Sequence, residues 1–269
     1  MGSDASDIQG ALQLVETWTK DWQLRIQPAK TEHITFSRVK HHLPNNYFLN
    51  GVSIPKVNNV KDLGLILSND LKWTSYVNHI KLKTSRLSNL ILRTFKGRNL
   101  SIYGQVYKTY IRPSLEYNVS IWSPSSLSNI KSIESIQRKY TKHVCKRLNI
   151  TFNNYSDRMK VFGLESLEYR RVKFDLVLVY KILNHLIDVD PDQFFLPSSF
   201  YSNHHLRRHN RCLTSITNPK TTTRNNFFSL RTLKLWNSLP QTVIQSESLQ
   251  VFKFRLNELN LCDYHQFLF

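Results

Sequence analysis

Hydrophobic and polar residues follow the period of an amphipathic helix over several long segments of the chain. From Ile8 to Trp22, and again from Trp73 to Phe95, apolar side chains recur every three or four residues. This pattern predicts a mainly α-helical protein. Further helices are predicted at Asn99 to Ile111, from Ser126 or Ser128 onward with Ile130, Ile133, Tyr140 and Val144 facing inward, at Asp175 to Leu186, at Phe227 to Trp236 and at Leu249 to Leu259.

The helical period is interrupted between residues 24 and 67, where short extended segments alternate with turn residues. Asn50-Gly51 is a favoured pair for the tight turn of a β-hairpin, and apolar residues flank it on both sides. We therefore expect a small amino-terminal α+β element before the helical part. Its predicted strands are Leu24 to Ile26, His33 to Ser37, Tyr47 to Leu49, Val52 to Ile54 and Val60 to Leu67.

Tyr107 to Pro124 is the densest aromatic and aliphatic segment of the chain, and it carries only three charges. Such a segment must be buried. Pro113 lies inside it and should end or kink the preceding helix. Asp175 to Leu186 is apolar almost all round, which predicts a central buried helix. We expect three domains: residues 1–70, a helical bundle at residues 71–149, and a basic helical domain at residues 150–269.

The chain is strongly basic, with 37 Lys and Arg against 19 Asp and Glu and a net charge of +18. The favoured partner is a polyanion, first nucleic acid and second an anionic membrane surface. No acidic residue lies between Asp70 and Glu116, although ordinary solvated helices mix the two signs. The cations that we expect on outward faces are Lys83, Arg86, Arg93 and Lys96, then Arg138, Lys139 and Lys142 beside Gln137, and Arg207, Arg208 and Arg211 in a long loop.

Other candidate chemistry is sparse. The sequence contains no glycine-rich phosphate loop, no serine nucleophile elbow and no zinc-protease helix motif. His204, His205, His209 and Cys212 have a spacing that could bind zinc, but a basic loop with several histidines is the favoured interpretation. Cysteines are few and odd in number, no apolar run reaches the about 18 residues of a membrane span, and no signal peptide is recognisable, so an intracellular protein of the cytoplasm or nucleus is expected.

Several motifs resemble one known family. Tyr107 to Pro113, Leu115 to Tyr117, Trp122 to Pro124 and Trp236 to Pro240 are similar to segments in and after the thumb of reverse transcriptases of non-LTR retrotransposons, the jockey-like group of LINE elements. The resemblance implies the distal palm, the thumb and the carboxy-terminal domain of an RNA-directed DNA polymerase. It extends over nearly the whole chain, and its helical bundle would close over a template–primer duplex.

The resemblance also implies roles for particular residues. Lys30 falls where these polymerases carry a lysine thought to protonate the leaving pyrophosphate, and Leu63 and Gly64 fall in the hairpin that holds the primer. Gln27 and Asp62 depart from the family pattern, which has asparagine and an aromatic residue there. The family's metal-binding aspartates belong to an earlier part of the palm, so Mg²⁺ would be bound only if that part were supplied.

Three hypotheses follow. The chain is a truncated retrotransposon product that binds RNA or an RNA–DNA duplex without sequence preference and does not polymerise. Alternatively, it is part of a longer, active reverse transcriptase. The third hypothesis is a host-adopted helical module that uses its basic faces to bind an acidic protein.

Overall fold

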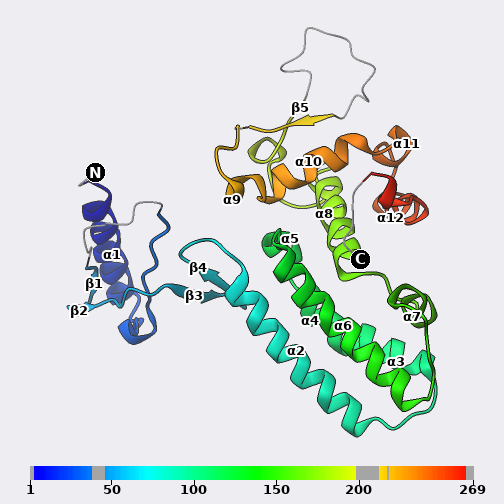
Figure 1. Ribbon diagram of the computed structural model, residues 1–269. Coiled ribbons are helices and arrows are strands. Elements are labelled where there is room, and N and C mark those ends of the chain that lie inside the picture. Colours follow the sequence, from blue (N-terminus) through cyan, green and yellow to red (C-terminus); the bar gives the residue numbers. More distant parts are fainter. Residues whose placement is uncertain (1–2, 38–45, 198–211, 217, 265–269) are drawn as a thin grey trace. The chain divides into compact units, whose positions relative to one another are not determined.

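The computed structural model describes residues 3–37, 46–197, 212–216 and 218–264, and these residues are mostly helical (Figure 1). The chain folds as two compact units, Met1–Tyr76 and Val77–Phe269, which we call the first and second unit. The predicted mainly helical fold with a few short strands is confirmed. The predicted division into three domains stays a prediction.

The first unit contains one long helix and two β-hairpins. Leu49, Tyr47 and Ile54 form its small core, against which Leu12 and Ile26 pack. Its elements are α1 (Ser3–Asp21), a 3₁₀ turn η1 (Pro28–Lys30), and the antiparallel pairs β1 (Phe48–Leu49) with β2 (Val52–Ser53) and β3 (Asn59–Asp62) with β4 (Leu65–Ser68).

Helix α1 is where predicted, but the face through which it packs overlaps only partly with the predicted apolar stripe. The side chain of Gln9 bonds the backbone of Phe48 twice, at 3.0 and 2.9 Å, and the Glu16 carboxylate accepts a hydrogen bond from the Asn50 amide. The predicted apolar stripe is only partly buried: Leu12 packs on the core and Thr19 is 7 % exposed, but Trp18 is 54 % and Trp22 68 % exposed. Backbone groups of the β1–β2 hairpin need hydrogen-bond partners, and Gln9 and Glu16 provide them from the face of α1 that lies against the hairpin.

The predicted strands of this unit are only partly correct. The Asn50-Gly51 hairpin is confirmed, and both turn residues have positive φ. The segment Val60 to Leu67 is a second hairpin and not one strand, because Leu63 and Gly64 reverse the chain between β3 and β4. Leu24 to Ile26 and His33 to Ser37 form no strands, and His33 makes only an isolated bridge with Lys56. A segment with no neighbouring strand cannot complete a ladder, whatever its residue pattern.

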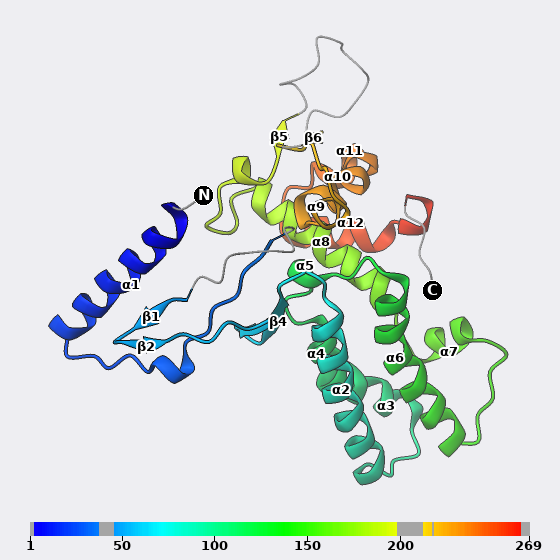
Figure 2. The ribbon, with the colours of Figure 1, turned by 60° about the vertical axis from the view of Figure 1, so that its left-hand side comes forward.

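Helix α8 (Leu167–Leu183) is the central element of the second unit, with helices α5, α6, α10 and α12 packed around it (Figures 1 and 2). Tyr180 of α8 stacks on Phe252, with ring centroids 4.3 Å apart, and Trp236 lies beside Phe252. The predicted central buried helix is therefore confirmed, although it begins earlier and ends earlier than expected.

The other elements of the second unit are short connections and flanking helices around this core. They are α2 (Thr74–Thr94, which begins in the first unit), α3 (Leu100–Val106), a π-helical turn η2 (Tyr107–Ile111), α4 (Arg112–Glu116), α5 (Val119–Trp122), α6 (Leu127–Arg147), α7 (Tyr155–Phe162), η3 (Pro191–Gln193), the antiparallel pair β5 (Leu196–Pro197) and β6 (Leu213–Thr214), α9 (Thr222–Asn225), α10 (Phe228–Ser238), α11 (Gln241–Ile244), α12 (Leu249–Glu258) and η5 (Leu261–Asp263).

The aromatic segment from Tyr107 to Pro124 is buried along one face, which confirms the prediction in part, because Tyr110 and Tyr117 are exposed. Tyr107, Ile111 and Leu115 are at most 1 % exposed, and Trp122 is fully buried with its ring nitrogen donating to the Tyr117 carbonyl at 2.7 Å. Pro113 does not end the helix, which continues to Glu116. A π turn directly before the proline, with the Arg112 amide bonded to the Tyr107 carbonyl, provides the wider turn that a residue without an N–H group needs.

Candidate nucleic-acid interface

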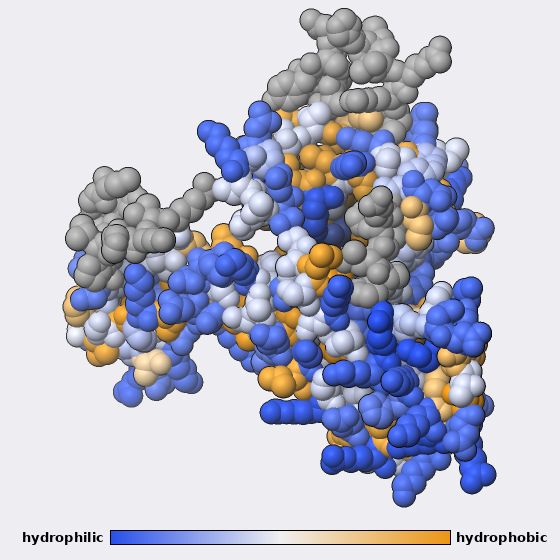
Figure 3. Space-filling model, in the orientation of Figure 1, coloured by the Kyte–Doolittle hydropathy of each residue, from blue (hydrophilic) through white to orange (hydrophobic). Residues whose placement is uncertain are grey.

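Helix α2 exposes a face that carries cations and no acid. Lys83, Arg86 and Arg93 are exposed, and so is Lys96 just beyond the end of the helix. Val77, Ile80 and Thr84, on the opposite side, are at most 3 % exposed, as the sequence predicts. In Figure 3 the surface over α2 is mostly hydrophilic, with scattered apolar patches. No Asp or Glu occurs anywhere from Thr74 to Thr94, so this positive charge is not neutralised within the helix.

Helix α6 also exposes cations and no acid, although its sequence contains one glutamate. Its predicted outward cations Arg138, Lys139 and Lys142 are all exposed. The helix does contain one acid, Glu134, but that residue is only 1 % exposed. The solvent-facing surface of α6 therefore offers a ligand positive charge alone.

Glu134 is buried because it joins α6 to the two helices that follow. Its carboxylate accepts hydrogen bonds from the Tyr155 hydroxyl at 2.8 Å and from the Leu167 amide at 2.9 Å. The second bond serves an amide at the start of α8, where backbone donors have no partner inside the helix. Burial raises the pKa of Glu134, although both hydrogen bonds and the nearby arginines favour the charged form.

The prediction that Gln137 faces outward is wrong. Gln137 is fully buried, and its amide nitrogen donates to the Glu165 carbonyl at 2.9 Å and to the Glu134 carboxylate at 3.3 Å. Thr141, one turn later, is also fully buried and accepts a hydrogen bond from Arg158 Nε at 3.0 Å. The i, i+3, i+7 spacing of these three polar residues was the sequence signal for a buried polar stripe.

Two arginines of α6 are held in place by the surrounding helices. The guanidinium of Arg138 lies 4.5 Å from the centre of the Tyr155 ring, in cation–π contact. Arg147 Nη1 donates to the Phe95 carbonyl at 2.8 Å, just beyond the end of α2, and to the Tyr103 hydroxyl at 3.2 Å. A carbonyl at a helix end needs such a partner, and the bond fixes α6 to α2.

The candidate residues of the first unit lie on turns. Lys30 is exposed at the end of η1. Leu63 is 80 % exposed at the tip of the β3–β4 hairpin, with φ 44°, and Gly64 follows with φ 86°. A leucine rarely adopts this left-handed conformation, and strain of this kind concentrates at functional sites. The sequence alone did not reveal that strain.

The structure does not describe several of the candidate residues named from the sequence. Arg207, Arg208, Arg211, His204, His205 and His209 lie outside the described residues. Cys212 is 3 % exposed. Within the described ranges, no group of three or more His, Cys, Asp or Glu side chains could hold a metal ion. No helix in those ranges is long and apolar enough to cross a bilayer.

A second set of charged residues lies inside the unit, around α8. Arg170 forms a bidentate ion pair with Glu116, and Arg231 forms one with Asp175, whose oxygens accept at 2.8 and 3.0 Å. Arg171, between them on α8, is 3 % exposed, and in the described part of the chain neither Nη1 nor Nη2 donates to any protein atom. No sequence pattern distinguishes Arg171, because Arg170-Arg171 resembles an ordinary basic pair.

Comparison with known proteins finds relatives over about half of the chain. This chain is 27 % identical over 156 residues to an uncharacterised protein of Caenorhabditis elegans. The alignment covers 53 % of this chain and 79 % of the nematode protein. The chain is also 27 % identical over 143 residues to the probable RNA-directed DNA polymerase from transposon X-element of Drosophila melanogaster, and 26 % identical over 143 residues to that from the mobile element jockey.

The two polymerase alignments cover 52 % of this chain but only 16 % and 15 % of the polymerases. No family model and no solved structure matches. The predicted resemblance to jockey-type polymerases is thus confirmed for about half of the chain, and its wider extent stays a prediction.

Proposed function

We propose that this chain is a nucleic-acid-binding part of a transposon RNA-directed DNA polymerase, which holds an RNA or RNA–DNA duplex through the outward faces of α2 and α6. One observation carries the proposal: these two helices expose lysines and arginines, and the only carboxylate in either of them, Glu134, is buried. A surface with a single sign of charge attracts the phosphate backbone without reading bases.

The arrangement of the two helices supports binding by both together. Arg147 links α6 to the end of α2, and Phe95 packs edge-on against Tyr103 with ring centroids 5.0 Å apart. The end of α2 is therefore bonded to the end of α6, and such contacts reduce the ordering that is required when a duplex binds. Arg138, held over Tyr155, contributes a cation of fixed position.

A salt titration with neutralising substitutions tests this function. The variant Arg86→Gln, Arg93→Gln, Lys139→Gln, Lys142→Gln removes two cations from each face. We expect the affinity of the unmodified chain for a mixed-sequence RNA–DNA duplex to fall about 10²- to 10³-fold between about 50 and 200 mM salt, and the slope of log affinity against log salt to become shallower by about 3–4 in the variant.

The matched control is Lys234→Gln with Lys253→Gln, two exposed lysines of α10 and α12. Fluorescence anisotropy should show the control with nearly the original slope. A flat salt response of the unmodified chain, or equal losses in the control, would contradict the proposal. Incorporation of nucleotides by the chain alone in a primer-extension assay with magnesium would contradict the hypothesis of a truncated product that does not polymerise.

The β3–β4 hairpin tip offers a separate test, because the resemblance to jockey-like reverse transcriptases implies that Leu63 lies in the hairpin that holds the primer. Leu63→Asn places a residue that tolerates positive φ at the turn, as Asn50 already does in the β1–β2 hairpin. The strain should be relieved, raising the free energy of unfolding by about 1 kcal/mol, while duplex affinity decreases. Higher stability with unchanged affinity would remove Leu63 from the interface.

A further inference from the structure

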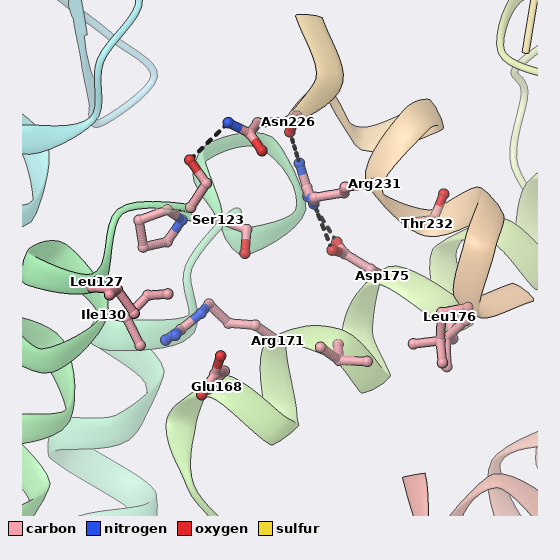
Figure 4. Close-up of a pocket in the computed structure, with 14 residues that line it drawn as sticks. Ser123, Leu127, Ile130, Glu168, Arg171, Asp175, Leu176, Asn226, Arg231 and Thr232 are labelled. Atoms are coloured by element: carbon pink, nitrogen blue, oxygen red, sulfur yellow. Dashed lines mark hydrogen bonds and ion pairs between the residues drawn. The ribbon is translucent and has the colours of Figure 1, made fainter. Parts of the chain in front are cut away.

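A pocket of about 340 Å³ lies in the second unit beside α8. The α5–α6 connection, the beginning of α6 and the residues around α9 and α10 form its other walls (Figure 4). Much of the lining is apolar, from Pro124, Leu127, Ile130, Val172 and Leu176. The volume falls within the range of about 300–1,000 Å³ that ligand sites occupy.

Arg171 is the unusual member of this lining. Its guanidinium group points from α8 toward Leu127 and Ile130 of α6, with the Glu168 carboxylate beside it (Figure 4). Only 3 % of the residue is exposed, and among the described residues no protein atom accepts a hydrogen bond from Nη1 or Nη2. Burial lowers the pKa of Arg171 in spite of four nearby carboxylates, yet an arginine keeps its charge. A buried donor pair of this kind requires an acceptor.

Arg231 lines the same pocket, but each nitrogen of its guanidinium group is hydrogen-bonded. It donates to both oxygens of Asp175, to the Asn226 carbonyl at 3.0 Å and to the Ser120 carbonyl. Its role in the pocket is therefore structural. Arg171 differs from it, because its two terminal nitrogens are buried at the pocket wall and have no acceptor among the described residues.

The charges around the pocket favour a neutral ligand over an anion. Two arginines, Arg171 and Arg231, face two carboxylates, Glu168 and Asp175, so the lining is neutral as a whole. A phosphate would approach the Glu168 carboxylate. A ligand that suits the lining has two adjacent acceptors for Arg171, donors for a carboxylate, and an apolar body for the walls.

A guanine base has this combination. Its O6 and N7 atoms are adjacent acceptors that match the two terminal nitrogens of an arginine, and its N1–H and N2–H groups are donors on the neighbouring edge. Proteins recognise RNA sequence mainly through such unstacked, unpaired bases. We propose that this pocket binds one unpaired guanine of the nucleic acid that the cationic faces hold, with Arg171 as the specificity-determining residue. The inference rests on the proposed function for the delivery of the strand.

The first experiment compares single-stranded RNAs of about 12 nucleotides that differ in one central base within a uridine background. Because their backbones are identical, the salt-dependent part of binding cancels. The full chain should bind the guanine strand about 5- to 150-fold more tightly than the all-uridine strand. Preference for another base, or none, would overturn the inference.

Two variants test the contribution of the pocket to binding independently of the cationic faces. Arg171→Met should abolish the preference for guanine and leave all-uridine binding unchanged. The substitution breaks no hydrogen bond of Nη1 or Nη2, but it removes a cation near Glu168, so the melting temperature of each variant is measured beside its binding. Leu127→Trp, at the exposed rim of the pocket, should also abolish the preference while Arg171 is retained. A preference that survives in both variants would overturn the inference.

Arg86→Gln and thermal shifts distinguish the two proposals. This variant should weaken binding of both strands equally and keep the guanine preference, whereas tight all-uridine binding without base preference would refute only the pocket. Guanosine monophosphate should raise the melting temperature of the unmodified chain and not that of Arg171→Met, even if polymer binding fails. An equal, Arg171-dependent shift with inorganic phosphate would identify an anion site and overturn the guanine assignment.

Discussion

The second unit contains two sets of cations, one exposed to solvent and the other close to carboxylates around α8. On α2 and α6 the lysines and arginines face solvent, and no exposed carboxylate lies among them in either helix. Around α8, Arg170 and Arg231 are partly buried and paired with Glu116 and Asp175, whereas Arg171 is buried without a protein acceptor for its terminal nitrogens. The comparison shows how a basic surface arises: burial removes Glu134 and Asp175 from the surface, and the remaining cations are left to attract a polyanion.

The largest expected effect comes from breaking a buried pair. Arg231→Met leaves the Asp175 carboxylate, 5 % exposed, without its cation. This should lower the free energy of unfolding by about 3–5 kcal/mol. The matched change on the outer face, Arg86→Met, should alter it by about 0.5 kcal/mol or less. Urea denaturation of both variants measures the contrast, and equal losses would mean that the two sets of cations do not differ.

The next largest effect on stability is expected for Glu134, the buried acid of α6. Glu134→Ala removes the acceptor of Tyr155 and of the Leu167 amide, and should cost about 1–3 kcal/mol. Glu134→Gln keeps an acceptor and should cost less.

The pH dependence of the same pair of proteins gives an independent check. Because burial raises the pKa of Glu134 above its ordinary 4.5, its stabilising contribution is complete below pH 4.5 and is lost as pH rises through the folded-state pKa. Denaturation between acidic and neutral pH should therefore show the unmodified chain losing stability relative to Glu134→Gln as pH rises. A parallel pH dependence of the two proteins would show that the Glu134 pKa is not raised.

Arg147 is intermediate between the two sets, being exposed yet bonded to the Phe95 carbonyl and the Tyr103 hydroxyl. Arg147→Ala should lower the free energy of unfolding by about 1 kcal/mol, since the helix-end carbonyl can still bond water. It should also loosen α2 against α6, which hydrogen exchange at the end of α2 would detect. Unchanged exchange there would show that the Arg147 bonds do not hold the two helices together.

The smallest effect on stability is expected for Lys142→Gln, with a change of about 0.5 kcal/mol or less. Its effect on binding should nevertheless be measurable as a salt slope shallower by about 1. A salt titration of this single variant sharpens the comparison, because it separates contribution to binding from contribution to folding. An unchanged slope would exclude Lys142 from the interface.

The sequence by itself determined the helical fold, the burial of the segment from Tyr107 to Trp122, and the cations on α2 and α6. These features follow from periodicity and composition, which are local properties of the chain. Only the tertiary structure decided which face of α1 packs, that Gln137 and Glu134 point inward, and that Arg171 is buried without a protein acceptor. Whether a polar side chain is buried depends on what distant segments bring to it, here Tyr155, Leu167 and Glu165. The spacing along α6 shows which polar residues share one face, but it does not identify their partners, because these come from other helices.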